Sequence, residues 1–151
     1  MCGIIGISSN KSVSSSIINS LKKLEYRGYD SAGIATLSQG LINEVKSEGR
    51  VENLENNFDL KSLSGNIGIG HVRWATHGVP NSINAHPHSS DNVSVVHNGI
   101  IENSTLLKKY LLNKGHKFKS QTDTEVIVHL ITENLKTSEL QEAITKTLKQ
   151  L

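Results

Sequence analysis

Apolar residues recur along most of the chain at spacings typical of strands and helices. Short runs rich in β-branched residues predict strands over residues 3–7, 32–37, 41–45, 67–74 and 93–97. Apolar positions three or four residues apart predict helices over residues 12–25, 106–115, 122–135 and 138–151, and a weak polar helix over residues 52–57. Residues 75–92, which hold both prolines, predict an irregular segment. The chain is therefore expected to mix strands with helices.

Two of the helices begin with a sequence typical of a capping box. Thr122 is followed three residues later by Glu125, and Ser138 by Gln141. In a capping box, the hydroxyl of the first residue and the longer polar side chain three positions later each accept a hydrogen bond from the other residue's backbone N–H. We therefore expect Thr122 and Ser138 to be N-caps.

Length and composition narrow the class of protein. The 151 residues suit one domain, residues 1–151, and 36% hydrophobic with 20% charged residues argues against a disordered chain. A net charge of +2 without a dense basic run gives no indication of nucleic-acid binding. No run approaches the ~20 apolar residues of a membrane span, and no signal peptide is evident. We expect a cytoplasmic protein that is not membrane-bound.

The single cysteine, Cys2, cannot form a disulfide within the chain. If Met1 is removed, the Cys2 thiol lies beside its own α-amine, whose usual pKa of about 7.7–8.0 lets it accept the thiol proton. This arrangement suits an N-terminal nucleophile. The alternative is an inert cysteine buried in the first strand.

Three further positions each allow a functional and a structural interpretation. Asn98-Gly99 could supply two oxyanion donors or form a type I′ hairpin turn. Arg73 could bind a carboxylate or lie on the surface, while Trp74 could cover a site or pack in the core. Asp123 could hold an ammonium group or stabilise the first turn of a helix. The residues alone leave these alternatives open.

Five of the seven histidines lie between His71 and His97. A zinc-binding module is therefore conceivable, but the chain has neither an HExxH sequence nor paired CxxC sequences. The glycine-rich segment from Gly65 to Gly70 runs into a strand and not a helix, and the chain has no GKS or GKT sequence, so neither nucleotide-binding fingerprint is met. We expect no metal and no cofactor.

Together and in order, several segments resemble one family, the class II glutamine amidotransferase domain of glucosamine-6-phosphate synthases. The resemblance spans the whole chain and is carried by Met1-Cys2-Gly3-Ile4-Ile5-Gly6, Leu24-Glu25-Tyr26-Arg27-Gly28-Tyr29-Asp30-Ser31-Ala32-Gly33, His71-Val72-Arg73-Trp74-Ala75-Thr76-His77-Gly78, Asn84-Ala85-His86-Pro87-His88, Val96-His97-Asn98-Gly99-Ile100-Ile101-Glu102-Asn103 and Thr122-Asp123-Thr124-Glu125-Val126.

The resemblance implies a role for each matching residue. Cys2 would attack the glutamine amide to form a γ-glutamyl thioester, with Asn98 and the Gly99 N–H as the oxyanion hole. Arg73 would bind the α-carboxylate and Asp123 the α-ammonium of L-glutamine. The remaining matches would line the pocket (Thr76, His77), gate the ammonia route (Trp74) or support the nucleophile (Arg27, Gly28).

The resemblance also implies an α+β fold, a four-layer αββα sandwich of antiparallel sheets, incomplete at the C-terminus. Fructose 6-phosphate would bind only to isomerase domains absent from this chain. A homodimer or a partner chain could complete the structure. The competing hypotheses are a truncated, non-catalytic remnant of such an enzyme and a small metal-binding module built on the histidines.

Overall fold

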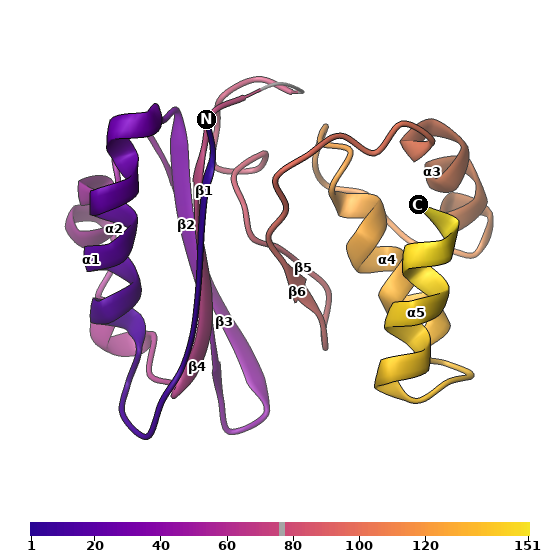
Figure 1. Cartoon of the computed structure of the whole chain (residues 1–151), viewed down its shortest axis with the longest axis horizontal. Coiled ribbons are helices and arrows are strands. Elements are labelled where there is room, and N and C mark those ends of the chain that lie inside the picture. Colours follow the sequence, from indigo (N-terminus) through magenta and orange to yellow (C-terminus); the bar gives the residue numbers. More distant parts are fainter. Residues whose placement is uncertain (76–77) are drawn as a thin grey trace.

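The computed structural model describes residues 1–75 and 78–151, and its elements stack in four layers (Figure 1). Helices α1 (Ser14–Leu24) and α2 (Glu52–Asn57) form one outer layer. A four-stranded sheet and a two-stranded sheet follow. Helices α3 (Ser104–Asn113), α4 (Glu125–Asn134) and α5 (Leu140–Gln150) form the other outer layer. The predicted αββα arrangement of antiparallel sheets is confirmed.

The larger sheet is antiparallel throughout, in the order β1-β4-β2-β3. Its strands are β1 (Gly3–Ser8), β2 (Ser31–Ser38), β3 (Leu41–Glu48) and β4 (Ile67–Arg73). The predicted hairpin at Gln39-Gly40 joins β2 to β3. Strand β4 lies between β1 and β2, so the nucleophile candidate at the start of β1 is beside the end of β4, where Gly3 pairs with Val72.

One face of β4 packs against α1 and is almost free of side chains. A Cβ atom at Gly70 would lie 2.5 Å from Ile17 and 3.0 Å from Leu21, and one at Gly68 would lie 2.7 Å from Ile17. Glycine therefore lets α1 approach the sheet closely. The helix buries Val13, Ile17, Ile18 and Leu21 in a core that also includes Ala32, Ile34 and Val72.

The smaller sheet consists of β5 (His88–Ser89) and β6 (Ser94–Val95). The strand predicted over residues 93–97 is thus shorter than expected. Strand β2 comes close to the segment before β5, because a Cβ atom at Gly33 would lie only 2.2 Å from the His86 carbonyl oxygen. A second core on the far side joins α3 to α4 and contains Ile101, Leu111, Val126, Ile127 and Leu130.

Both predicted capping boxes are wrong. Helix α4 begins at Glu125, whose carboxylate accepts hydrogen bonds from the backbone N–H groups of Lys119 (2.8 Å) and Ser120 (2.7 Å). The Thr122 hydroxyl instead bonds to His88 Nε2 at 2.8 Å. A histidine on β5 and backbone groups of the preceding loop therefore take the place of the capping-box partners.

Helix α5 begins at Leu140, and neither α4 nor α5 has a side-chain hydrogen bond from its N-cap residue. The Ser138 hydroxyl accepts a hydrogen bond from Lys146 Nζ at 2.7 Å. Within the described ranges, no helix is both long and apolar enough to cross a membrane.

The contact between Gly33 and His86 predicts an intolerant position. Gly33→Ala should lower the free energy of unfolding by about 2–3 kcal/mol, because the added methyl group meets a backbone carbonyl that cannot rotate away. Gly6→Ala is the matched control on β1, since the atom nearest its added Cβ is 4.0 Å away. Urea unfolding of both variants measures the difference. Equal stabilities would contradict the close contact.

Candidate active site

A cavity of about 520 Å³ opens where several distant segments of the chain meet. These segments are the N-terminus, the turn at Arg27, the end of β4, the stretch before β5 at His86, the stretch after β6 and the stretch before α4. Seven predicted site residues line the cavity: Cys2, Arg27, Arg73, Trp74, Asn98, Gly99 and Asp123. Thr76 and His77 lie outside the described residues. The predicted constellation therefore gathers at one place, as far as the structure describes it.

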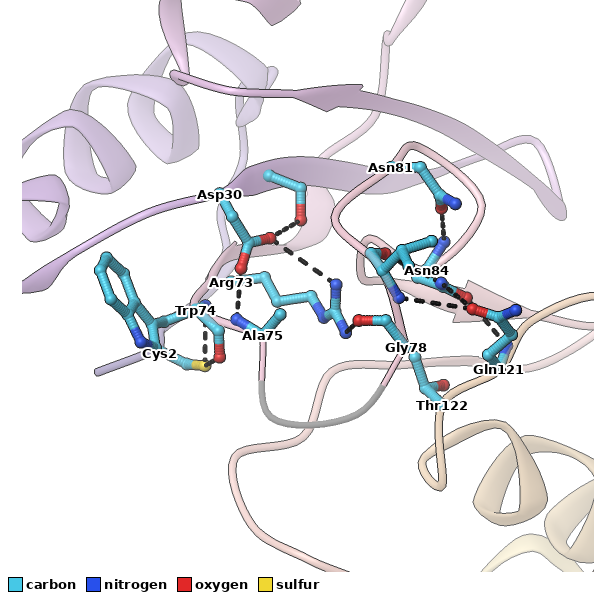
Figure 2. A network of polar contacts seen from close by, with 12 residues as sticks. Cys2, Asp30, Arg73, Trp74, Ala75, Gly78, Asn81, Asn84, Gln121 and Thr122 are labelled. Carbon is cyan, nitrogen blue, oxygen red and sulfur yellow. Dashed lines mark hydrogen bonds and ion pairs between the residues drawn. The ribbon is translucent and has the colours of Figure 1, made fainter.

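Cys2 lies at the start of β1 with its thiol toward the end of β4. The Trp74 backbone N–H donates to Cys2 Sγ at 3.2 Å, and Sγ lies 3.4 Å from the Trp74 carbonyl oxygen (Figure 2). Cys2 is partly exposed, so the interpretation as a cysteine buried in the first strand is wrong. The Met1 ammonium donates to the Arg27 carbonyl oxygen at 2.6 Å, and Met1 is 70% exposed.

Asn98-Gly99 does not form the tight hairpin turn that the dipeptide also allows. Strand β6 ends at Val95, and the chain runs on to α3. The Asn98 side chain bonds in two directions: Oδ1 lies 2.8 Å from His71 Nε2, and Nδ2 donates to the Cys2 carbonyl oxygen at 3.4 Å. Its amide group is thus held next to the nucleophile.

Arg73 is buried, so the interpretation as a surface arginine is wrong. Its side chain is 5% exposed and forms an ion pair with Asp30, with Nη1 3.6 Å from Oδ1. Its Nη2 donates to the Gly78 carbonyl oxygen at 3.3 Å, and Asp30 also accepts the Ala75 N–H (Figure 2). Sequence reasoning missed Asp30 as the partner. A buried charge requires an opposite charge, but the sequence alone did not show that Arg73 is buried.

Trp74 is not a core residue, because it is 52% exposed at the rim of the cavity. Its ring packs over Gly28, where an added Cβ atom would lie 2.5 Å from a ring carbon. Gly28 also has a φ of 109°, in the region that favours glycine. Gly28 therefore supports Trp74 from behind and does not line the cavity.

Asp123 precedes α4 by two residues, and its side chain reaches across to another segment. Its Oδ2 accepts the backbone N–H of Ile101 at 2.6 Å. This bond ties the stretch after Gly99 to the stretch before α4, and Asp123 lines the cavity. Helix-dipole stabilisation alone does not explain that placement.

Sequence reasoning also missed a polar network that holds the loop after β4. Asn84 Nδ2 donates to the Val79 carbonyl oxygen at 2.9 Å and to Gln121 Oε1 at 3.1 Å, and the Gln121 N–H donates to Asn84 Oδ1 at 2.8 Å (Figure 2). Asn84 is 1% exposed. Nothing in the local spacing indicated this pairing, because the two residues lie 37 positions apart.

Three buried histidines are in ring contact beside the cavity, and two of them, His71 and His86, line it. The His71 and His86 rings stack with centroids 4.3 Å apart, and His86 meets His88 edge-on at 4.7 Å. Burial lowers the pKa of His71 to about 4 and that of His88 to about 3, and it lowers the pKa of His86 as well. All three are neutral near pH 7. No group of three or more potential metal ligands occurs among the described residues.

The chain is similar in sequence to known proteins. A family model described as a glutamine amidotransferase domain matches residues 59–141, more than half of the chain. The protein belongs to the glutamine amidotransferase family. Similar curated relatives are the glutamine–fructose-6-phosphate aminotransferases (isomerising) of Bartonella henselae, 53% identical over the whole chain, and Clostridium acetobutylicum, 59% identical over 87% of it. The chain spans 25% and 22% of their lengths, respectively.

Solved structures agree. The glutamine phosphoribosylpyrophosphate amidotransferase from B. subtilis, complexed with ADP and GMP, superposes on the whole chain with a TM-score of 0.82 at 31% identity. A structure titled as the allosteric regulatory enzyme of purine biosynthesis gives a TM-score of 0.83, also at 31% identity. The chain covers 33% of each. The resemblance inferred from the sequence motifs is confirmed.

The buried histidines predict a stability that falls in mild acid. Between about pH 6.5 and 4 the unfolded chain binds protons at His71, His86 and His88 that the folded chain does not, so folding weakens as the pH falls through this window. Each histidine contributes a slope of up to about 1.4 kcal/mol per pH unit. Urea unfolding from pH 7.5 to 5 measures the total.

His88→Gln is the diagnostic variant, because glutamine keeps a donor for Thr122 but does not titrate. The slope should drop by about one proton. Glu125, whose pKa hydrogen bonds lower to about 2 despite its burial, affects stability only below about pH 4.5. An unchanged slope in His88→Gln would contradict a neutral His88.

The ion pair with Asp30 predicts a second stability effect. Asp30→Asn should lower the free energy of unfolding by about 2–3 kcal/mol, because it leaves the buried Arg73 guanidinium without its carboxylate. Glu142→Gln, which removes one exposed partner of Lys146 on α5, is the control and should cost under about 0.5 kcal/mol. Thermal and urea unfolding both report the difference, and matching losses would rule out a special contribution of Asp30.

Proposed function

We propose that this chain carries the glutaminase half-reaction, in which L-glutamine and water give L-glutamate and ammonia. The observation that carries the proposal is the meeting of a thiol and a fixed amide at one cavity. Cys2 Sγ bonds to the Trp74 backbone while Asn98 Nδ2 bonds to the Cys2 carbonyl oxygen. Arg73 and Asp123 supply a cation and an anion to the same cavity. Such a set suits an amino acid with a side-chain amide.

The nucleophile requires loss of Met1. The exposed Met1 is accessible for removal, and cleavage leaves an α-amine on Cys2 itself. This amine takes the thiol proton as sulfur attacks the glutamine δ-carbon. The carbonyl π-electrons move to oxygen and form a tetrahedral oxyanion. When the intermediate collapses, the amine returns its proton to nitrogen, ammonia leaves, and a γ-glutamyl thioester remains. Water then attacks the thioester and releases glutamate and the thiol.

The oxyanion calls for donors that are oriented before the reaction begins. The Asn98 amide and the Gly99 N–H follow one another in the segment that lines the cavity beside Cys2. Donors of this kind typically stabilise the transition state by about 3–4 kcal/mol each. The oxyanion hole therefore accounts for a large part of the rate.

The two charged side chains set the orientation of the amino acid. The Arg73 guanidinium matches an α-carboxylate and the Asp123 carboxylate an α-ammonium. Their placement leaves the side-chain amide to reach Cys2. The remaining roles follow the resemblance: Trp74 gates the ammonia route, Thr76 and His77 line the pocket, and Arg27 and Gly28 support the nucleophile.

The part of the relatives that binds the acceptor of ammonia lies outside the segment that this chain shares with them. The relatives named as fructose-6-phosphate aminotransferases are about four times as long as the segment they share with this chain. We infer that amination of fructose 6-phosphate needs those other parts, supplied in the same polypeptide or by a partner chain. A nucleophilic thiol suits the reducing cytoplasm.

Intact-mass spectrometry with the glutamine analogue 6-diazo-5-oxo-norleucine tests the proposal directly. The purified protein should have lost Met1 and should gain a single adduct, since the analogue presents a reactive carbon where the glutamine amide would lie. Cys2→Ala should gain none. A wild-type chain that lacks Met1, is folded and takes no adduct would favour the non-catalytic remnant.

Asn98→Ala separates transition-state stabilisation from binding. We expect kcat for glutamine hydrolysis to fall by about 10²–10³-fold with a small change in KM, because one oxyanion donor is lost. Asp123→Asn should instead raise KM. Steady-state ammonia release measures both, and a KM effect confined to Asn98→Ala would reverse the assignments.

A further inference from the structure

The side chain of Asn98 needs an anchor. It lies in an irregular stretch between β6 and α3 and is exposed, so its backbone alone does not fix the direction of its amide group. An amide that rotates by 180° exchanges a donor for an acceptor. In the reversed orientation, an oxygen would face the developing oxyanion and repel it. Catalysis at this site therefore depends on which way the amide points.

His71 supplies the anchor from the face of β4 opposite α1. Gly70 and Val72 face α1, so His71 between them faces the second sheet, where it is 1% exposed. Its Nε2 lies 2.8 Å from Asn98 Oδ1. A carbonyl oxygen only accepts, so the ring must carry its proton on Nε2. The reversed amide would set Oδ1 against the Cys2 carbonyl oxygen, acceptor against acceptor.

The surroundings keep the His71 ring in one form. Burial, together with the positive charge of Arg73, lowers its pKa to about 4, and the stacked His86 restrains the ring plane. The other titratable group that faces it is His97. A neutral histidine has one N–H, so the bond to Asn98 selects the Nε2–H tautomer.

Resting on the glutaminase function proposed above, we propose that His71 is a positioning residue that holds the Asn98 amide with its N–H group toward the oxyanion. His71 does not touch the substrate. It acts on the reaction through Asn98 and so contributes to the transition state more than to the binding of glutamine.

A pair of inhibitors gives a readout that a general loss of structure would not move. Glutamate γ-semialdehyde can add to the Cys2 thiol and form a tetrahedral oxyanion, whereas glutamate binds without forming one. His71→Leu should weaken the aldehyde about tenfold relative to glutamate, since a typical hydrogen bond is lost. His71→Gln, which keeps a donor, should restore most of the preference. Equal weakening of both inhibitors in His71→Leu would overturn the proposal.

A double-mutant cycle asks whether His71 acts through Asn98. In the Asn98→Ala background, His71→Leu should lower kcat little further, because the group it positions is already absent. Independent, additive losses would overturn the proposal. Urea unfolding of each variant confirms that the comparison is made between folded proteins.

NMR of the free wild-type protein separates this inference from the proposed function. With ¹⁵N-labelled histidine, the His71 ring should remain neutral and in the Nε2–H form from pH 8 to 5.5. An Nδ1–H form, or titration near pH 6.5, would overturn the positioning role even if glutamine is hydrolysed. A wild-type chain with the Nε2–H form but no hydrolysis and no aldehyde binding would refute the glutaminase function.

Discussion

Strand β4 must pack against a different layer on each of its two faces, and both the apolar core and the candidate site depend on this arrangement. On one face its glycines admit α1 to within contact of the sheet. On the other face, His71 and Arg73 extend toward the cavity and are both buried. The alternation of a strand makes this division possible, since neighbouring side chains point to opposite sides. A shift of register by one residue would place the arginine in the apolar core and destroy both layers.

The sequence predicted the elements better than their ends. The helices and the β2–β3 hairpin were predicted correctly, because the apolar positions that define their periodicity are also the ones that pack in the folded protein. The capping boxes failed because Thr122 and Glu125 each bond to a residue of another segment or an earlier part of the loop. The strand predicted over residues 93–97 was too long. Its apolar run continues to Val96 and His97, but β5 offers a partner only as far as Val95. Local propensity cannot report the availability of a partner.

Ordered motifs, and not any single residue, singled out the residues of the candidate site. Cys2, Arg73, Asn98, Gly99 and Asp123 do line one cavity, although each had an ordinary structural explanation alone. The residues that hold them in place were missed. Arg73 is paired with Asp30 and Asn98 with His71, each across a long sequence separation. The same holds for Asn84, which bonds to Gln121 and so holds the loop after β4. Such pairs appear only when the chain is folded.

The approach of Gly33 to the His86 carbonyl has a consequence for how such a protein can change over time. Strand β2 and the segment that leads into β5 meet there through main-chain atoms, so no exchange of side chains can bring them nearer. Any larger residue can only push them apart. The depth of the space between the layers thus has a fixed lower limit. Sequence drift elsewhere in either layer can alter the chemistry of the cavity wall without narrowing it at this point.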